Sequence, residues 1–583
     1  MAYIDRVNTK LRGEFGGQVI ASEADGCLLL AGELENWADI VRAGTLAAKQ
    51  GRFAKKRYRG LVNNIRFLGA SPPIRLPAVE DAALEGETPD VLVIGAGITG
   101  CAIARELARY KLKILLVDKE HDVAKHASSR NDGMVHPGID LRRGTKKHSY
   151  NRRGNLMYEG ITRELGVDFE RTGQYLCFGT PWIIPLLYLS LLYWKWLGIP
   201  GVRVIGGKEL HRKEPGLGGK LRAALFFPTA GVVCPYNLTI AYGENAVQNG
   251  VTLSLDTAVL GMTLRDGRIA AVKTNRGSVS PRVVVNAAGV FAEDIAAMAG
   301  DRFYSIHPRR GTNIILDKKV APSLVRTIAS KIGTSSLSAH TKGGGMVRTV
   351  HGNLLVGPDA VETFEKENFA THAASIDALL AKFQETSPGI STGHIITYFT
   401  GVRAPTYEED FVVCKGIKTG NLVHAAGIQS PGLTAAPAIA LDIVRFVKEI
   451  LEDEGGPVAP NPDFTPLRKP IPQTAHMETE ERRALIEKNP DYGIILCRCE
   501  EVSKGEILES LRRPVPCDTL DGVKRRVRPG MGRCQGGFCG PLILKLIAGE
   551  KGIPLEEVTK DGPGSPVLLG AAKTDGEGKK HEG

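Results

Sequence analysis

PDVLVIGAGITGCAIARELARYKLKILLVDKEHDVAKHASSRNDGMVHPGID, which spans residues 89–140, decides the fold of this chain. An apolar run at 91–94 is short enough to be a buried strand, and a helix over about 98–110 follows it. A second apolar run, 113–117, ends at Asp118. A strand, a helix and a strand in this order predict an α/β fold with a Rossmann-like sheet.

Three glycines join the first strand to the helix, and each has a separate purpose. Gly95 makes the tight turn, Gly97 lets the backbone approach a pyrophosphate, and Gly100 lets the helix pack close to the strand. Asp118 stands where a carboxylate would accept the ribose hydroxyls. Because all of these features fall in register, the stretch predicts a dinucleotide site.

The size and composition of the chain set limits on what surrounds that site. With 583 residues the chain is long for one core, so we expect three or four domains. The formal net charge of +11 suits an anionic substrate, an acidic partner or a membrane surface as well as nucleic acid, so charge alone does not choose. The amino terminus lacks a secretory signal core, and no run of 18 apolar residues occurs. We therefore expect a cytoplasmic protein.

Residues 1–70 predict a small α+β domain, and 71–89 predict a linker. The expected elements are strands at 18–22, 27–31 and 61–67 and a helix at 36–50. The pattern resembles the BON domains, small modules linked to phospholipid or ligand binding. Between residues 40 and 79 there are nine basic residues and no acid, which favours a solvated basic face or contact with an anionic surface.

The loop HASSRNDGMVHPGID, after the dinucleotide motif, resembles the FAD-dependent oxidoreductases of the D-amino-acid oxidase and glycerol-3-phosphate dehydrogenase type. The resemblance covers about residues 90–451 and implies an FAD-binding domain with an antiparallel-sheet substrate domain. It also implies the residues that contact FAD: Gly95, Gly97, Gly100, Asp118, Ser128, Ser129, Val259, Ala288, Gly289, Gly427, Gly432, Leu433 and Thr434. The last three open a helix whose positive end would point at the flavin pyrimidine ring.

Two residues are candidates for catalysis. TYFTGVRAPT resembles the family segment whose arginine, here Arg403, grips the substrate's phosphate or carboxylate, and a planar guanidinium matches two such oxygens. We expect His136, in GMVHPG, to take the hydroxyl proton, because a near-neutral pKa suits a general base. The alternative is that His136 only hydrogen-bonds the cofactor or its loop.

TPWIIPLLYLSLLYWKWLGIP, residues 180–200, is the most apolar stretch and holds three of the four tryptophans. It is too short to span a bilayer comfortably. Its pattern favours a buried or dimer-facing helix, and the alternative is an interfacial membrane helix with tryptophans at headgroup depth.

Four cysteines near the carboxyl end have the spacing of metal ligands: Cys497, Cys499, Cys534 and Cys539. Four thiolates fit zinc or an iron–sulfur cluster equally well. CRCEEV and MGRCQGGFC resemble the bacterioferritin-associated-ferredoxin-like domain, which implies a [2Fe-2S] cluster in a small helical domain at 477–572. A proline-rich linker is expected at 452–476 and a disordered tail at 573–583. Cys517 matches no ligand position, so we expect it to be structural.

A flavin and a one-electron cluster on one chain imply a dehydrogenase that passes electrons to a second redox protein or quinone, and no nucleic-acid partner. The resemblance favours oxidation of sn-glycerol 3-phosphate to dihydroxyacetone phosphate. Asp140, Pro431 and Gly432 stand where aerobic relatives carry an arginine and a lysine, so a 2-hydroxy acid such as L-2-hydroxyglutarate is the alternative substrate. An alternative of another class is an electron-transfer subunit of a larger flavoprotein. Peripheral contact with the inner face of the membrane fits the basic and apolar segments.

Overall fold

The computed structural model describes residues 3–51, 58–331 and 344–570. The chain divides into two compact units, Met1–Arg468 and Lys469–Gly583, which are described separately here. The expected tail at 573–583 and four of the basic residues between 40 and 79 lie outside the described residues.

A six-stranded sheet forms the centre of the first unit, in the order β12-β5-β4-β16-β24-β23. All neighbouring strands are parallel except β23, which pairs antiparallel with β24. Its strands are β4 (Val91–Ile94), β5 (Ile114–Val117), β12 (Thr252–Ser254), β16 (Val283–Asn286), β23 (Val412–Lys415) and β24 (Leu422–Ala426). The predicted Rossmann-like sheet is confirmed, and β4, β5 and β16 are buried throughout, as strands covered on both faces should be.

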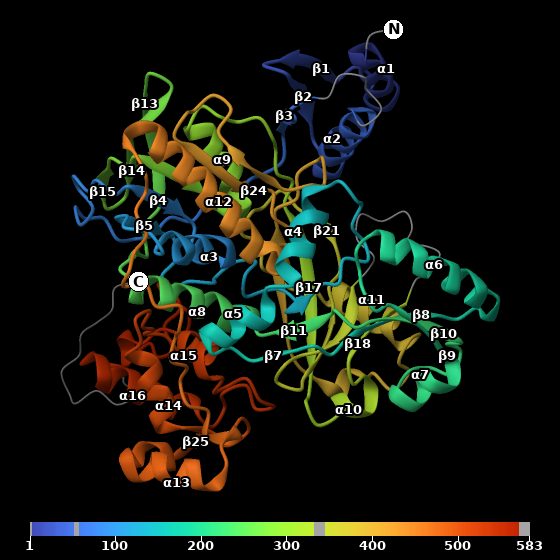
Figure 1. The fold of residues 1–583 in the computed structure, drawn as a ribbon, viewed down its shortest axis with the longest axis vertical. Coiled ribbons are helices and arrows are strands. Elements are labelled where there is room, and N and C mark those ends of the chain that lie inside the picture. The colour runs from blue at the N-terminus through green and yellow to red at the C-terminus, as the bar shows by residue number, and fades with distance from the viewer. Residues whose placement is uncertain (1–2, 52–57, 332–343, 571–583) are drawn as a thin grey trace. The chain divides into compact units, whose positions relative to one another are not determined.

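Helices pack on this sheet and on one another around the first βα turn. α3 (Ile98–Leu107) contacts both α8 (Pro235–Gln248) and α12 (Gly432–Gly455), and α12 also contacts α4 (Lys146–Asn155). In Figure 1, α3 and α12 lie beside β4 and β24. The shorter helices are α5 (Tyr158–Leu165) and α9 (Ala292–Met298). This packing sets α3 and α12, both of which begin at glycine turns, against the same sheet.

The substrate part of the first unit is a nine-stranded sheet, mostly antiparallel as expected. The exception is β18, which pairs parallel with β8. Its strands are β8 (Gln174–Phe178), β9 (Arg203–Gly206), β10 (Ala223–Phe227), β17 (Arg309–Leu316), β18 (Ile328–Lys331), β19 (Gly345–Arg348), β20 (Leu354–Gly357), β21 (Val361–Glu362) and β22 (Ile395–Arg403). Helices α7 (Gly207–Lys213), α10 (Ala321–Leu324) and α11 (Ala373–Gln384) add leucines and a phenylalanine to its core.

Two three-stranded sheets complete the oxidoreductase part of this unit. They comprise β13 (Val259–Arg265), β14 (Arg268–Thr274) and β15 (Gly277–Val279), and β6 (Met134–Val135), β7 (Phe169–Glu170) and β11 (Gly231–Val233).

The amino-terminal segment has its own sheet and core but packs on the oxidoreductase part of the same unit. It comprises α1 (Tyr3–Phe15), β1 (Val19–Ala24), β2 (Cys27–Leu34), α2 (Trp37–Gly51) and β3 (Leu61–Phe67). Tyr407 belongs to its core cluster, and the Asn63 side chain donates to the Tyr407 hydroxyl at 2.9 Å. The Leu61 amide donates to Glu408 at 2.6 Å. The segment is therefore joined to the chain that follows β22.

The apolar stretch at 180–200 forms a short 3₁₀ turn and α6 (Ile184–Trp196). Leu187 and Trp194 are the buried residues of α6, and most of its other large side chains are exposed. Within the described ranges no helix has both the length and the apolar character needed to cross a membrane.

The second unit is small and mainly helical, as expected. Its elements are α13 (Thr479–Lys488), β25 (Ile495–Cys497), β26 (Val502–Ser503), α14 (Lys504–Leu511), α15 (Leu520–Val527) and α16 (Gly540–Lys551). Ser503 and Glu506 form a capping box that begins α14. The proline-rich segment before this unit runs along the first unit, where the Lys111 amide donates to Ala459 and the Arg468 side chain pairs with Glu244.

Candidate active site and cluster site

A cavity of about 1560 Å³ opens at the glycine turn and reaches the nine-stranded sheet. A Cβ on Gly95, whose φ is +107°, would lie 2.5 Å from the Ala287 carbonyl oxygen. A Cβ on Gly100 would lie 1.8 Å from the Gly95 carbonyl oxygen. A Cβ on Gly97 would lie 2.9 Å from the Ser128 hydroxyl. Gly95 and Gly100 therefore require glycine because a Cβ at either position would meet the backbone, whereas a Cβ on Gly97 would displace the Ser128 hydroxyl.

The loop after β5 closes over the beginning of α3. Ser128 accepts a hydrogen bond from the Ile98 amide at 2.9 Å and lines the cavity. Ser129, also expected at the cofactor, instead donates to the carbonyl oxygens of Lys125 and His126. Its side chain thus holds the loop together, and only Ser128 of the pair lines the cavity.

Asp118 lies at the end of β5, on the cavity wall with Val259, Ala288 and Gly289. Its two oxygens accept the amides of Ala96 at 2.6 Å and Glu120 at 2.9 Å. Burial raises the pKa of Asp118. The carboxylate therefore ties both strand ends together at the place where the ribose hydroxyls were expected.

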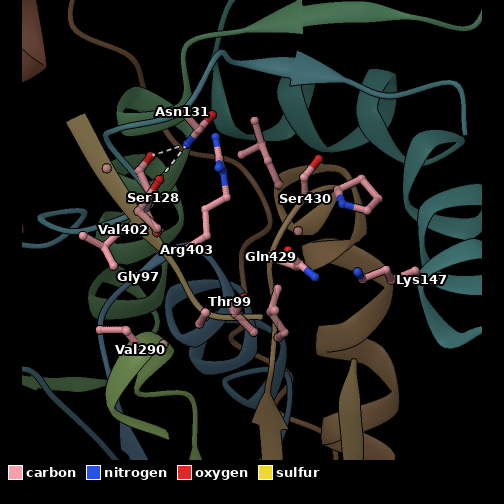
Figure 2. A pocket seen from close by; sticks show the side chains of 18 of the residues that line it. Gly97, Thr99, Ser128, Asn131, Lys147, Val290, Val402, Arg403, Gln429 and Ser430 are labelled. Atoms are coloured by element: carbon pink, nitrogen blue, oxygen red, sulfur yellow. Dashed lines mark hydrogen bonds between the residues drawn. The ribbon is translucent and has the colours of Figure 1, made fainter. Parts of the chain in front are cut away.

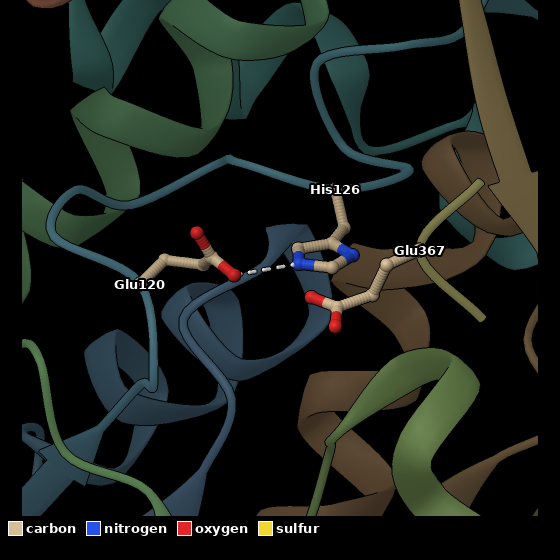
Figure 3. Close-up of side chains that lie close together, drawn as sticks. All are labelled: Glu120, His126 and Glu367. Atoms are coloured by element: carbon tan, nitrogen blue, oxygen red, sulfur yellow. Dashed lines mark hydrogen bonds and ion pairs between the residues drawn. The ribbon is translucent and has the colours of Figure 1, made fainter. Parts of the chain in front are cut away.

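A cluster of ionisable side chains lies beside Asp118, at the rim of the cavity. Figure 3 shows Glu120, His126 and Glu367 facing one another, and His126 Nε2 lies 2.9 Å from Glu120. Lys119 and Arg75 each pair with both glutamates. Burial would raise the pKa of Glu120, but these partners outweigh burial and hold it well below its ordinary value. Because two cations already neutralise the carboxylates, we read the cluster as an ion-pair network that ties the 71–89 segment to the cavity rim.

The amino terminus of α12 forms another wall, where Gly432 and Leu433 line the cavity. Thr434 lies behind them, and its hydroxyl accepts the His136 amide at 2.9 Å. Gly427 also lies behind the wall: its φ is +63°, and a Cβ there would lie 2.7 Å from the Thr406 methyl carbon. The positive end of a 24-residue helix thus faces the cavity.

His136 lines the cavity and is held from several sides. Its carbonyl oxygen accepts the side-chain amides of Asn151 at 3.3 Å and Asn155 at 2.9 Å. Its Nε2 lies 3.4 Å from the Ser430 hydroxyl. The backbone is therefore fixed, while the ring lies in the cavity beside a polar partner.

Arg403 ends β22 and also lines the cavity. Its guanidinium donates to the carbonyl oxygens of Arg310 at 3.3 Å and Asp359 at 3.0 Å, so its charge has no carboxylate partner among these bonds. Burial and then the charge of Arg309 lower the pKa of Arg403 to about 10, which still leaves it protonated at neutral pH. A Cβ on Gly311 would lie 2.0 Å from this guanidinium, so the neighbouring strand leaves room for it.

A second cation in the cavity was not expected from the sequence. Lys147, in the first turn of α4, is buried and lies 3.5 Å from Glu409, and Gln429 also donates to that carboxylate. Burial lowers the pKa of Lys147. In the view of Figure 2, Arg403 and Lys147 lie on opposite sides of Gln429. Two cations therefore flank one polar pocket.

Glu409 stabilises this arrangement, since it accepts hydrogen bonds from Arg309 at 2.9 Å as well as from Gln429. Burial would raise its pKa, but the charges of Arg309 and Lys147 outweigh burial and lower it to about 2. Ionised Glu409 should therefore stabilise the fold above the ordinary glutamate pKa, by at most about 3 kcal/mol, and this contribution should fade as the pH falls towards 2.

We expect Glu409→Gln to lower the thermal unfolding midpoint at pH 7, with a difference from wild type that narrows below pH ~4.5. Unfolding followed by fluorescence between about pH 2.5 and 8 would measure this difference. The exposed substitution Glu35→Gln is the control and should leave the midpoint unchanged. A difference that stayed constant with pH would contradict the ion-pair account of Glu409.

The four expected cysteine ligands gather in the second unit. Cys499 and Cys534 lie 3.5 Å apart, and Cys497 hydrogen-bonds Cys539. Hydrogen bonding from Cys539 and from the amides of Gly530 and Glu500 lowers the pKa of Cys497 to about 6. Backbone amides of 536–538 lower the pKa of Cys534. Such donors favour thiolates, the form that binds metals.

The arrangement of the sulfurs distinguishes between the two metal hypotheses. A tetrahedral zinc with bonds of 2.3 Å would bring all four sulfurs to within about 3.8 Å of one another. In the described part of the chain, only Glu120, His126 and Glu367 place three ligand atoms within 4.8 Å. The cysteines therefore form two pairs, which fits two iron atoms better than one metal ion. Cys517 lies apart and donates to the Ser510 carbonyl oxygen.

Comparison with known proteins agrees with both sites. The family model described as FAD dependent oxidoreductase, DAO, matches residues 90–445, and the model described as BFD-like [2Fe-2S] binding domain matches 495–549. The first match covers more than half of the chain. This chain therefore belongs to the DAO family of FAD-dependent oxidoreductases. Its second unit carries a BFD-like [2Fe-2S] binding domain.

Individual relatives are glycerol 3-phosphate dehydrogenases and oxidases by name. The chain is 36% identical to a glycerol 3-phosphate dehydrogenase of Caloramator mitchellensis, over 83% of this chain and 99% of that protein. It is 24% identical to anaerobic glycerol-3-phosphate dehydrogenase subunit A1 of Haloferax volcanii, over 80% of this chain and 83% of the subunit. The solved structure of reduced L-α-glycerophosphate oxidase from Mycoplasma pneumoniae, with FAD bound, matches with a TM-score of 0.59 and 25% identity, covering 66% of this chain and 98% of that one. The expected family, fold and cofactors are confirmed.

Proposed function

We propose that this chain oxidises sn-glycerol 3-phosphate to dihydroxyacetone phosphate. The observation that carries the proposal is one cavity that joins the dinucleotide turn to His136 and to two cations, the half-buried Arg403 and the buried Lys147. The names of the Caloramator and Haloferax relatives support this choice of substrate. A phosphate dianion carries several oxygens on one atom, so it can accept hydrogen bonds from both cations at once.

In this proposal each residue has a defined task. Arg403, whose guanidinium is held by two carbonyl oxygens, and Lys147, held by Glu409, bind the phosphate between them. His136 accepts the proton of the hydroxyl that is oxidised, and Ser430 orients its ring.

The cofactors provide the redox chemistry. When bound, FAD accepts two electrons and a [2Fe-2S] cluster transfers them one at a time. The remaining FAD contacts that we propose are Gly95, Gly97, Gly100, Asp118, Ser128, Val259, Ala288, Gly289, Gly432 and Leu433, with Ser129, Gly427 and Thr434 shaping the loops behind them. Cys497, Cys499, Cys534 and Cys539 hold the cluster.

The presence of the cluster domain suggests a separate electron acceptor. We propose a second redox protein or a quinone, reached from a cytoplasmic enzyme that contacts the inner face of the membrane peripherally. We also propose that residues 90–451 act as the catalytic part and 477–572 as the electron-transfer part.

Arg403→Met tests the phosphate contact. Removing a hydrogen bond to a charged group should lower kcat/KM for glycerol 3-phosphate by about 10–150-fold. The slow turnover of glycerol, which has no phosphate, should stay unchanged, and so should the FAD content. Steady-state assays with an artificial electron acceptor would measure both substrates.

The control for this substitution is Arg212→Met, on α7 and outside the cavity lining. It should change kcat/KM for neither substrate. An equal loss for glycerol and glycerol 3-phosphate would contradict phosphate binding by Arg403. A higher kcat/KM for L-2-hydroxyglutarate than for glycerol 3-phosphate in the wild type would replace the proposed substrate.

A further inference from the structure

The outer face of α6 is a continuous apolar surface. Five large side chains recur at helical spacing along it, and they are Trp182, Leu186, Leu189, Tyr193 and Trp196. Their exposed fractions lie between 48% and 85%, and Tyr188 and Leu192 beside them are exposed as well. In Figure 1, α6 lies at the periphery of the first unit. Single exposed apolar residues are ordinary, but a patch of seven indicates a contact surface.

The inner face of the same helix is anchored. Leu187 and Trp194 are buried in a cluster with side chains of β8 and β10, and the Trp194 ring packs edge-on against Phe227. The Trp194 indole also donates to Ser190 at 3.1 Å. The helix is therefore apolar on both sides: the body of the protein covers one side, and the other is presented outward.

Cations surround this outer face. Arg143 stacks over the Trp196 ring at 4.5 Å, and a Cβ on Gly198 would lie 3.0 Å from the Arg152 side chain. Arg142 and Lys195 are exposed in the same region. Residues 141–158 and 171–208 contain no Asp or Glu. We call Arg142, Arg143, Arg152 and Lys195 the basic rim.

We propose that the outer face of α6 inserts into the interfacial layer of an anionic lipid bilayer, which specifies the peripheral membrane contact proposed above. Its 13 residues span about 20 Å as a helix, too short to cross the hydrocarbon core. Tryptophan and tyrosine favour the headgroup level, and leucines between them favour the acyl chains. The basic rim supplies the attraction to anionic headgroups.

A bilayer fits this face better than a second copy of the chain. In a symmetric dimer the same patch meets itself, so the basic rims would come together with no acid from 141–158 or 171–208 to neutralise them. The surface of an anionic bilayer is negatively charged over its whole area, which is opposite to the charge of the basic rim. The charges therefore favour lipid over self-association.

The position of the face connects it with catalysis. Residues 139–145, which include Arg142 and Arg143 of the basic rim, also line the active-site cavity, and so do Gln174 and Leu176 of β8, the strand before α6. Bilayer contact through α6 would therefore place this side of the cavity at the membrane surface.

The test is flotation of the full-length holoprotein with phosphatidylglycerol-containing vesicles and with pure phosphatidylcholine vesicles. We expect binding to the anionic vesicles that weakens by at least tenfold on neutral vesicles or in high salt. Leu186→Ser/Leu189→Ser/Leu192→Ser should lower the partition coefficient at least about 100-fold. The matched control, Ile20→Ser/Leu467→Ser/Leu569→Ser, changes equally exposed side chains and should bind like the wild type.

Brominated lipids give a second readout. They should quench the tryptophan fluorescence of the wild type, and Trp182→Phe/Trp196→Phe should remove most of the quenching while the buried Trp194 remains. No flotation with either vesicle would overturn the proposal. A lipid-independent dimer that dissociates in the triple-serine variant would also overturn it, in favour of a second copy. Reduction of the flavin by glycerol 3-phosphate, followed in the same variants, should be unchanged, so a failure of the substrate assignment is seen separately.

Discussion

His136→Asn should slow flavin reduction by glycerol 3-phosphate by about 10²–10⁴-fold, because it removes the group that takes the hydroxyl proton. Asparagine keeps a polar side chain of similar length, and the hydrogen bonds of the residue's amide and carbonyl to Thr434, Asn151 and Asn155 remain. FAD content should therefore be that of the wild type. Stopped-flow absorbance under anaerobic conditions would measure the rate.

The matched control for His136 is His211→Asn on α7, whose ring contacts the Leu221 carbonyl oxygen outside the cavity lining. In that variant, glycerol 3-phosphate should reduce the flavin at the wild-type rate. If the flavin of His136→Asn were also reduced at the wild-type rate, the imidazole of His136 would only position the loop or the cofactor. The proton of the substrate hydroxyl would then need another acceptor. A rise in the wild-type reduction rate with pH that is absent from the variant would identify His136 as the base.

Cys534→Ser should abolish assembly of the [2Fe-2S] cluster, so that iron and acid-labile sulfide fall to near zero. Serine cannot replace a thiolate whose backbone hydrogen bonds from 536–538 already favour the charged form. The flavin should still be reduced by substrate, but transfer to a one-electron protein acceptor should be lost. Iron analysis and electron paramagnetic resonance of the dithionite-reduced protein would measure the change.

Cys517→Ser is the control for the cluster, because Cys517 is buried in the same unit and its thiol donates to the Ser510 carbonyl oxygen. It should retain full iron content. Iron loss in both variants would mean that the unit tolerates no serine at a buried cysteine, and the ligand assignment would then lose its support. Zinc in place of iron in the wild type would contradict the reading of the sulfurs as two pairs.

The parts of the site that the sequence predicted are those built from neighbouring residues. The turn from β4 through Gly95 to α3 is local, and a Cβ on Gly100 would meet the Gly95 carbonyl oxygen of the same turn. The same holds for the two ligand motifs, 497–499 and 534–539, whose cysteines are close in the sequence. Such motifs carry their geometry in their spacing.

The parts that the sequence could not predict depend on distant segments. Lys147, Glu409 and Gln429 come from the beginning of α4, the chain after β22 and the turn before α12, and only the fold brings them together. In the sequence, Lys147 lies in a basic run that looks like a solvated face. The α1 helix was not among the expected elements, although the sequence does indicate it. Val7, Leu11 and Phe15 recur every fourth residue, which is typical of a helix, and all three are buried.

Some of the expected cofactor contacts lie one residue away from the cavity lining. Ser129 and Thr434 each follow a residue that lines it, Ser128 and Leu433, and consecutive side chains in a tight loop or helix start point in different directions. A motif therefore gives the right loop, while the backbone conformation decides which of two adjacent residues reaches the cofactor.

The most direct test of the central claim is an anaerobic titration of the purified holoprotein with sn-glycerol 3-phosphate, recorded by visible absorbance. We predict that the oxidised flavin bands bleach as substrate is added, and that dihydroxyacetone phosphate forms in equal amount. Flavin bands that stay oxidised with glycerol 3-phosphate, while a partner flavoprotein can still reduce the cluster, would contradict the account and identify the chain as an electron carrier.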